Sequence, residues 1–171
     1  MNIESVFVKD FYYTREADTS FLPPLIRRKL GSLDKFAISA MESVYSKEIE
    51  EIVFASKAGE VDRLNKIISQ YKEMNEVSPA QFSASVHNYP VGFFTLYKKI
   101  NIPYFALAAG DKTFENGLIK ASISAYNNVM FVYAEKDFAL SCVLSKKEGK
   151  LRLSNIPETT DEFITLWEDA K

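Results

Sequence analysis

Residues 104–117 have the sequence YFALAAGDKTFENG, and this stretch decides the fold class. A short apolar run passes through small residues and Gly110 into a segment with helical spacing. Small residues tolerate a tight turn from strand to helix, and the helix N-terminus presents backbone N–H groups at the end of the strand. The stretch therefore predicts a buried strand over 103–108, a sharp turn and a helix over 113–126, which is the geometry of a nucleophile elbow.

Strands and helices alternate on both sides of this stretch. Apolar or alternating runs predict further strands over residues 3–11, 51–56, 129–134, 138–144 and 151–155. Apolar residues at helical spacing predict helices over residues 25–45, 60–75, 91–98 and 159–171, with Ser78 and Pro79 beginning another short helix. This order predicts one α/β layered domain, residues 1–171, with a mainly parallel sheet.

Two details of this arrangement can be compared directly with a structure. We expect the strands 138–144 and 151–155 to be joined as a hairpin through residues 146–150. We also expect the helix over 60–75 to turn one apolar stripe toward the core. The members of that stripe are Val61, Leu64, Ile67, Ile68 and Tyr71.

Composition and charge exclude several classes of protein. The chain of 171 residues is 47% hydrophobic, has a net charge of −2 and carries no basic stripe, so nucleic-acid binding has little support. No run approaches the ~18 apolar residues of a membrane span, and the first residues do not resemble a signal peptide. Cys142 is the single cysteine, which fits a reducing compartment. We expect a soluble, cytoplasmic protein in which Cys142 is a buried structural thiol.

The elbow lacks a nucleophile. Its positions Leu107, Ala108, Ala109 and Gly110 include no Cys, Ser or Thr, and an alkyl side chain cannot form an acyl-enzyme. Taken alone, the stretch is an ordinary strand–turn–helix.

His87 and its neighbour Asn88 are a candidate polar site. One histidine can act as a general base, and Ser83 or Ser85 lies close to it in sequence. The structural interpretation, in which His87 caps a helix or hydrogen-bonds a loop carbonyl, is favoured. One His and one Cys are too few for a zinc site, and no phosphate-binding glycine motif occurs. We expect neither a metal nor a cofactor.

Four segments together resemble a known family. They are FLPPLIRRKL at 21–30, VFASKAGE at 53–60, FSASVHN at 82–88 and ALAAGDKTFE at 106–115. Their order and spacing over residues 21–135 are similar to β-ketoacyl synthase N-terminal-domain-like proteins, often called chain-length factors. These proteins are associated with polyene-pigment, polyketide and related fatty-acid-like biosynthesis. The resemblance implies a thiolase-like half, a layered mixed sheet in the order βαβαβαββ with helices packed on both faces.

The resemblance also implies how this chain departs from a catalytic synthase. A full-length synthase has a cysteine at the elbow and two histidines in a second half. Here the elbow position falls at Ala108, give or take one residue, and the second half has no counterpart. The thiolate holds the growing chain and the histidines stabilise developing negative charge, so we expect a pseudoenzyme that condenses nothing alone.

A partner follows from the same resemblance. Ketosynthases dimerise by pairing the strand that precedes the elbow. Here that strand is Ile102, Pro103, Tyr104, Phe105, Ala106 and Leu107, whose apolar character suits burial on both faces. The expected partner is a full-length catalytic ketosynthase, or a second copy of the chain. The cations of segment 27–29 could help receive an acidic acyl carrier protein.

Two other functions stay open from the sequence. One is a small serine hydrolase or acyltransferase that uses Ser83 or Ser85 with His87. The other is a plain interaction domain without acyl chemistry.

Overall fold

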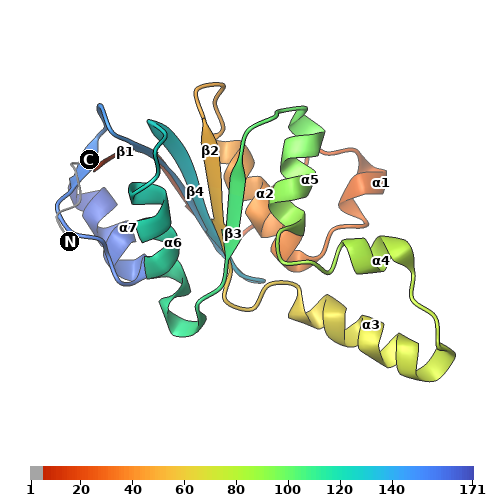
Figure 1. Ribbon diagram of the computed structural model, residues 1–171. Coiled ribbons are helices and arrows are strands. Elements are labelled where there is room, and N and C mark those ends of the chain that lie inside the picture. Colours follow the sequence, from red (N-terminus) through yellow and green to blue (C-terminus); the bar gives the residue numbers. More distant parts are fainter. Residues whose placement is uncertain (1–5) are drawn as a thin grey trace.

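A six-stranded mixed sheet forms the centre of the computed structural model, which describes residues 6–171 (Figure 1). The strand order is β3-β2-β4-β5-β1-β6. The strands are β1 (Val6–Thr14), β2 (Glu51–Ala55), β3 (Tyr104–Leu107), β4 (Asn128–Ala134), β5 (Ala139–Ser145) and β6 (Leu151–Leu153). Strands β3, β2 and β4 run parallel, whereas β5 and β6 each pair antiparallel with β1 and β5 also pairs antiparallel with β4. The sheet is therefore mixed, which corrects the mainly parallel sheet expected from the element order.

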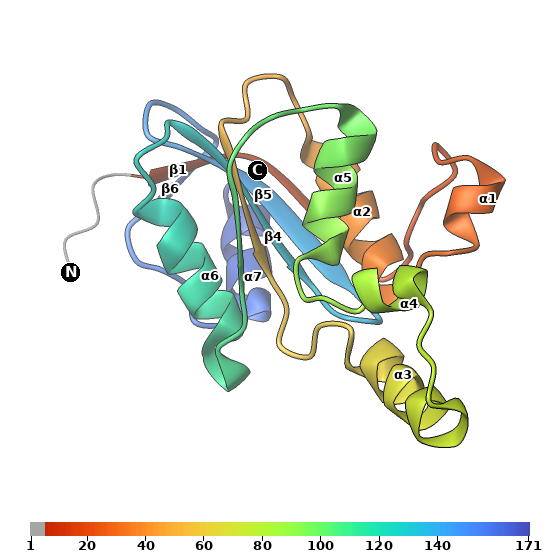
Figure 2. The same ribbon diagram turned by 45° about the vertical axis from the view of Figure 1, so that its right-hand side comes forward.

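Helices cover both faces of the sheet (Figure 2). The helices are α1 (Pro24–Arg27), α2 (Ser32–Val44), α3 (Val61–Met74), α4 (Pro79–Ser83), α5 (Tyr89–Lys98), α6 (Thr113–Ser122) and α7 (Thr160–Asp169), with a 3-10 turn, η1 (Gly110–Lys112), before α6. One core lies between the sheet and α2 with α5, and the other lies between the sheet and α6 with α7.

The side chains of β2 point alternately into the two cores. Ile52 and Phe54 point into the core under α2 and α5, whereas Val53 and Ala55 point into the core under α6. All five residues of β2 are buried, as expected for a central strand that packs on both faces.

The expected hairpin between the last two strands is wrong. Strand β1 lies between β5 and β6 and pairs with both of them. The connecting turn passes the beginning of β1, where the N–H of Lys150 donates to the carbonyl oxygen of Val8 at 2.8 Å. The hairpin was predicted because the two strands are close in sequence. In the structure, the backbone N–H and C=O groups of both strands pair with β1, which comes from the N-terminal part of the chain. The part of the first predicted strand at residues 3–5 lies outside the described residues.

The expected burial of α3 is also wrong. Of the predicted stripe only Ile67 is buried, while Val61, Leu64, Ile68 and Tyr71 are exposed. Both ribbon views show α3 and α4 projecting from the body at one corner, away from the sheet (Figures 1 and 2). Helical spacing identified residues that share a face, but within residues 6–171 only Ile67 of that face is buried.

Within residues 6–171, no helix is both long enough and apolar enough to span a membrane.

Candidate functional site

Strands β2, β3 and β4 are parallel, so their carboxyl ends lie along the same side of the sheet. The turns that follow the three strands therefore lie close together. The turn 56–59 follows β2, the turn 108–112 follows β3, and Glu135 follows β4. We call these three segments the carboxyl-edge site.

The turn after β3 has the elbow geometry that the sequence predicted. Gly110 adopts a left-handed backbone with φ of 58°, which glycine reaches without a steric penalty. The buried Thr113 hydroxyl accepts a hydrogen bond from the N–H of Ala109 at 2.8 Å and donates to the Gly110 carbonyl at 2.7 Å. This hydroxyl therefore holds the turn. The three elbow residues 108–110 are exposed and carry no nucleophilic group.

Charged side chains connect the turn after β2 to the turn after β3 and to Glu135. The Glu135 carboxylate accepts hydrogen bonds from the N–H of Lys57 at 2.5 Å and from the Ser56 hydroxyl at 3.4 Å. Lys57 forms an exposed ion pair with Asp111, and this pairing raises the pKa of Lys57 and lowers the pKa of Asp111. Burial, together with the charge of Glu135, raises the pKa of Tyr133 to about 12. The Glu135 carboxylate thus accepts a backbone N–H that could otherwise bind an external anion.

His87 lies in the turn between α4 and α5 and contacts the carboxyl-edge site at Ser56 and Gly59. Its Nε2 is 2.9 Å from the Ser56 carbonyl oxygen, so Nε2 carries the proton and donates it to that acceptor. The imidazole lies 5.5 Å from the Phe54 ring, measured between centroids. Gly59 has φ of 56°, and a Cβ there would approach the imidazole to 2.8 Å. The hydrogen bond to a loop carbonyl is the one expected from the sequence.

The serines near His87 are placed differently from a catalytic arrangement. Ser83 is exposed on α4, and the Ser85 hydroxyl donates to the Phe82 carbonyl at 2.8 Å. Asn88 is exposed, and its Nδ2 lies 3.4 Å from the Tyr104 hydroxyl of β3. The structure therefore gives His87 a backbone partner and links Asn88 to the edge strand.

Within residues 6–171, strand β3 lies at the edge of the sheet and pairs with β2 alone. It begins at Tyr104, so Ile102 and Pro103 precede it, although the Pro103 carbonyl still accepts from the N–H of Ile52. Tyr104 and Phe105 are 40% and 44% exposed, so the burial expected on both faces is not realised within this chain. The Nζ of Lys120 lies 5.2 Å from the Phe105 ring centroid.

A buried charged cluster beside the site was not found from the sequence. Asp34 of α2 and Glu60 before α3 both contact the guanidinium of Arg63, at 2.7 Å and 3.1 Å. Arg63 also donates to the Ala84 carbonyl at 2.5 Å, and the N–H of Gly31 donates to Asp34 at 2.8 Å. The cluster joins the root of α3 to α2 and to the end of α4.

Two carboxyls share one arginine in this cluster, so the single guanidinium charge balances only one of them. Burial, reinforced by the charge of Asp34, raises the pKa of Glu60 to about 7, and burial also raises the pKa of Asp34. Asp34 Oδ1 and Glu60 Oε1 are both buried without a hydrogen-bond partner, so burial disfavours the charged form of each carboxyl. The only sequence signal is the spacing of Glu60 and Arg63, because Asp34 joins them through tertiary packing.

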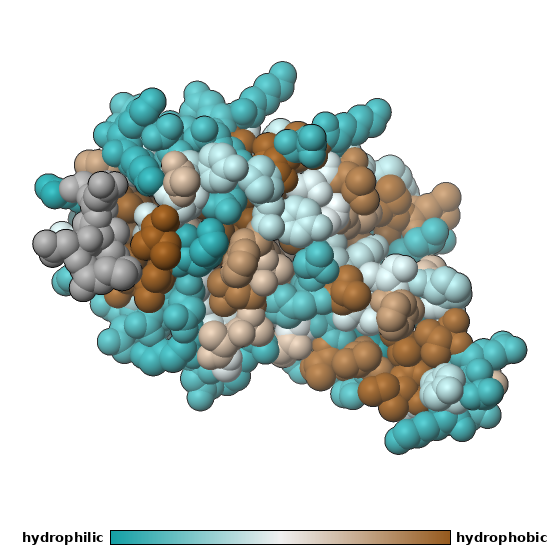
Figure 3. All heavy atoms as spheres, in the orientation of Figure 1, coloured by the Kyte–Doolittle hydropathy of each residue, from teal (hydrophilic) through white to brown (hydrophobic). Residues whose placement is uncertain are grey.

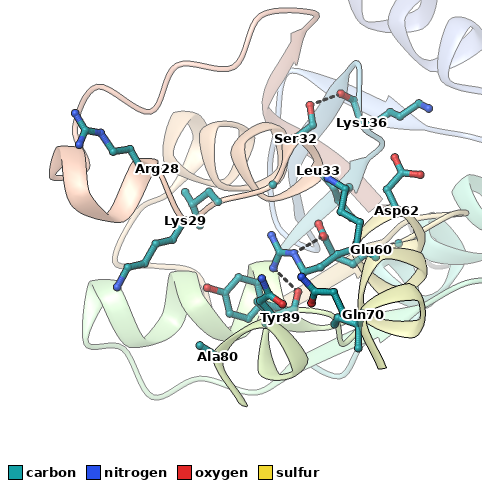
Figure 4. A pocket seen from close by; sticks show the side chains of 18 residues that line it. Arg28, Lys29, Ser32, Leu33, Glu60, Asp62, Gln70, Ala80, Tyr89 and Lys136 are labelled. Atoms are coloured by element: carbon teal, nitrogen blue, oxygen red, sulfur yellow. Dashed lines mark hydrogen bonds and ion pairs between the residues drawn. The ribbon is translucent and has the colours of Figure 1, made fainter. Parts of the chain in front are cut away.

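The cluster forms part of the wall of a cavity of about 730 Å³ between the α1–α2 connection, α3 and α4. Figure 4 shows Arg28 and Lys29 on one side of it and Glu60 and Gln70 on the other, with Tyr89 below. Lys66 and Lys136 add to the exposed cations on its rim.

Metal and thiol chemistry find no support in the described part of the chain. Among residues 6–171, no group of three His, Cys, Asp or Glu side chains is arranged to hold a metal ion. Cys142 is fully buried on β5, and burial raises the pKa of its thiol. The prediction of a buried structural cysteine is confirmed.

Comparison with known proteins gives a family and a fold. A family model described as "Beta-ketoacyl synthase, N-terminal domain" matches residues 9–140. A comparison with curated proteins found no match. A solved structure of the ketosynthase ApeO in complex with its chain length factor ApeC, from Xenorhabdus doucetiae, contains a similar chain with a TM-score of 0.78 and 19% identity. The similarity covers 97% of this chain and 91% of that chain, so the two are of similar length and share the thiolase-like half fold.

Proposed function

Because this chain belongs to the β-ketoacyl synthase N-terminal-domain family, we propose that it is a non-catalytic, chain-length-factor-like subunit of a catalytic ketosynthase. Its role is to assist acyl-chain assembly of the fatty-acid, polyketide or polyene type, by shaping the acyl tunnel or steadying its partner. In this proposal residues 1–171 act as one thiolase-like domain in the cytoplasm. The observation that carries the proposal is an exposed elbow without a nucleophile, directly after a strand that lies at the edge of the sheet in the described part of the chain.

The elbow supports a role without covalent catalysis. Acyl transfer to a synthase requires a side chain that can form a thioester, and residues 107–110 provide only alkyl groups and a glycine. Thr113, whose hydroxyl contacts the elbow backbone, is buried and engaged in two hydrogen bonds. Cys142 is in the core under α6 and α7 and has a raised pKa, which lowers its thiolate population.

The edge strand supports pairing with another chain. The carbonyls of Pro103 and Leu107 accept hydrogen bonds from β2, so alternate residues of β3 turn their backbone toward β2. The backbone N–H and C=O groups of Tyr104 and Ala106 therefore point toward the free edge. Unpaired edge groups are a template for strand addition, and the apolar side chains of Tyr104 and Phe105 would be covered by the same partner.

The similar chain in the ApeO–ApeC structure supports the choice of partner. That structure holds a ketosynthase together with its chain length factor, and the matched chain has nearly the length of this one. A chain of this size with the same half fold is therefore compatible with a ketosynthase complex.

An acyl carrier protein is a further part of the proposal. Carrier proteins of this chemistry are acidic, and on the rim of the 730 Å³ cavity the exposed cations Arg28, Lys29, Lys66 and Lys136 outnumber the exposed Asp62. Such a rim favours encounter with an acidic surface, mainly through the rate of association.

Co-purification tests the pairing. The chain is mixed with a full-length, cysteine-containing ketosynthase from the same genome, and the mass of the mixture is measured by size-exclusion chromatography with light scattering. A complex containing both chains is expected. Two separate peaks with unchanged masses would contradict the proposal.

A further inference from the structure

Helix α3 carries an exposed apolar stripe that the fold leaves uncovered. Val61, Leu64, Ile68 and Tyr71 recur at helical spacing, and their exposed fractions run from 43% to 54%. Met74 at the end of α3, Phe82 on α4 and Val86 after it continue the apolar surface, at 67%, 60% and 43%. We call these seven residues the α3–α4 face. A contiguous apolar surface of this kind marks an interaction site more often than scattered surface residues do.

The α3–α4 face lies on the same side of the molecule as the β3 edge. In Figure 1, β3, α3 and α4 are all toward the viewer, and Figure 3, in the same orientation, shows hydrophobic residues gathered over α3 and α4. A partner that pairs with β3 would approach the molecule from this side.

The size of β3 shows why a second contact is needed. A four-residue strand is about 13 Å long, and it exposes two backbone pairs and two aromatic side chains. A stable interface buries roughly 800 Å² on each partner, from about 20 residues a side. The β3 edge alone supplies too little surface, and the α3–α4 face adds seven exposed apolar side chains on the same side.

The charges around the stripe favour a protein occupant over a lipid surface. Asp62, Lys66, Lys72 and Glu73 lie on the exposed polar sides of α3, and together they are neutral. Helices that lie on membranes have a polar face rich in Lys and Arg. A mixed rim around an apolar centre is the pattern of protein interfaces.

The buried cluster holds this face in a fixed position. Arg63 joins α3 to Asp34 of α2 and to the Ala84 carbonyl after α4, and Ile67 in the middle of α3 is buried. A surface that is already ordered loses less conformational entropy on binding.

We propose that the α3–α4 face is the second half of the contact with the catalytic ketosynthase, completing an interface that begins at the β3 edge. This inference rests on the proposed function and names the surface through which that function is carried out. The occupant is the ketosynthase, so the apolar stripe is covered in the working complex and exposed only in the isolated chain.

Two matched double variants test the inference. Leu64→Glu with Ile68→Glu places two charges on the stripe, and Asn65→Glu with Ser69→Glu places the same charges at the same spacing on exposed polar positions of α3. All four positions are exposed, so both variants should fold, which circular dichroism checks. Affinity for the full-length ketosynthase is measured by isothermal titration calorimetry, and the mass of each chain alone is measured by light scattering.

The stripe variant is expected to weaken binding at least about 30-fold, and the control variant less than about threefold. Wild-type binding reports on the proposed function, and the difference between the two variants reports on the inference. Equal affinity of the stripe variant and the wild type would overturn the inference while leaving the proposed function intact. A wild-type self-dimer that only the stripe variant dissociates, with unchanged ketosynthase affinity, would assign the face to a second copy. Absence of wild-type binding would overturn both.

Discussion

The Nε2 of His87 lies 2.9 Å from the carbonyl oxygen of Ser56, and this contact gives the histidine of the chain a structural role. The proton on Nε2 is donated to a backbone acceptor at the end of β2. The ring also lies against Phe54 and over Gly59, where a side chain would not fit. His87 therefore holds the turn after α4 against the carboxyl-edge site.

His87→Ala should lower the free energy of unfolding by about 1 kcal/mol, because one hydrogen bond to the Ser56 carbonyl is lost. Urea unfolding followed by circular dichroism measures this change. The isolated chain should not hydrolyse acyl thioesters, and Ser83→Ala with Ser85→Ala should leave the chain folded. Thioester turnover that disappears in both variants would instead establish the serine-hydrolase alternative.

Glu60 should make stability depend on pH. Burial and the Asp34 charge raise its pKa from 4.5 to about 7 in the folded chain, so the folded state binds a proton that the unfolded state has released. The free energy of unfolding should therefore fall as pH rises from about 4.5 to about 7, with a contribution on the order of 2 kcal/mol. Glu60→Gln, which keeps the hydrogen-bonding shape without titrating, should flatten this part of the profile.

The control for this experiment is Glu73→Gln on the exposed side of α3. Its pH profile, measured by thermal unfolding between pH 4 and pH 8, should follow the wild type. Identical pH slopes for Glu60→Gln and the wild type would show that Glu60 does not hold the extra proton.

Thiol labelling should distinguish the core from the elbow. Cys142 is fully buried with a raised pKa, so a disulfide reagent such as DTNB should label the native chain only after unfolding. A Cβ at Gly110 would meet no atom within 4 Å, so the added thiol of Gly110→Cys should react rapidly. The left-handed backbone makes this variant less stable by about 1 kcal/mol. Rapid labelling of the native wild-type chain would contradict the placement of Cys142.

Proline substitution should separate the two edges of β3. Ala106→Pro removes an N–H that points toward the free edge, so ketosynthase affinity should fall at least about tenfold while the ladder to β2 stays intact. Phe105→Pro removes an N–H that faces β2 and should lower the melting temperature. Ala106→Val keeps the N–H and serves as the control for binding. Unchanged affinity in Ala106→Pro would show that the partner does not add a strand at this edge.

The elbow and the central strands were predictable because their signals are local. The small residues and Gly110 after an apolar run determined the turn, and the continuous apolar run of β2 determined a strand buried on both faces. The resemblance supplied the thiolase-like half with its mixed sheet, which a chain-wide match to a solved structure confirms.

What the sequence missed depends on contacts between distant segments. The insertion of β1 between β5 and β6 joins the two ends of the chain, and the Asp34–Arg63 pair joins α2 to α3. The stripe of α3 was expected in the core because apolar spacing predicts a shared face without indicating what covers it. In the proposed complex, that cover is another protein.

Condensation activity tests the central claim most directly. The ketosynthase alone, this chain alone and their equimolar mixture are each given acyl-carrier-protein substrates, and the rate and length of the acyl products are measured by mass spectrometry. We expect no condensation by this chain alone, and a changed rate or product length when the two proteins form a heterodimer. If the partner's activity, product length and oligomeric state are all unchanged by mixing, the account is contradicted.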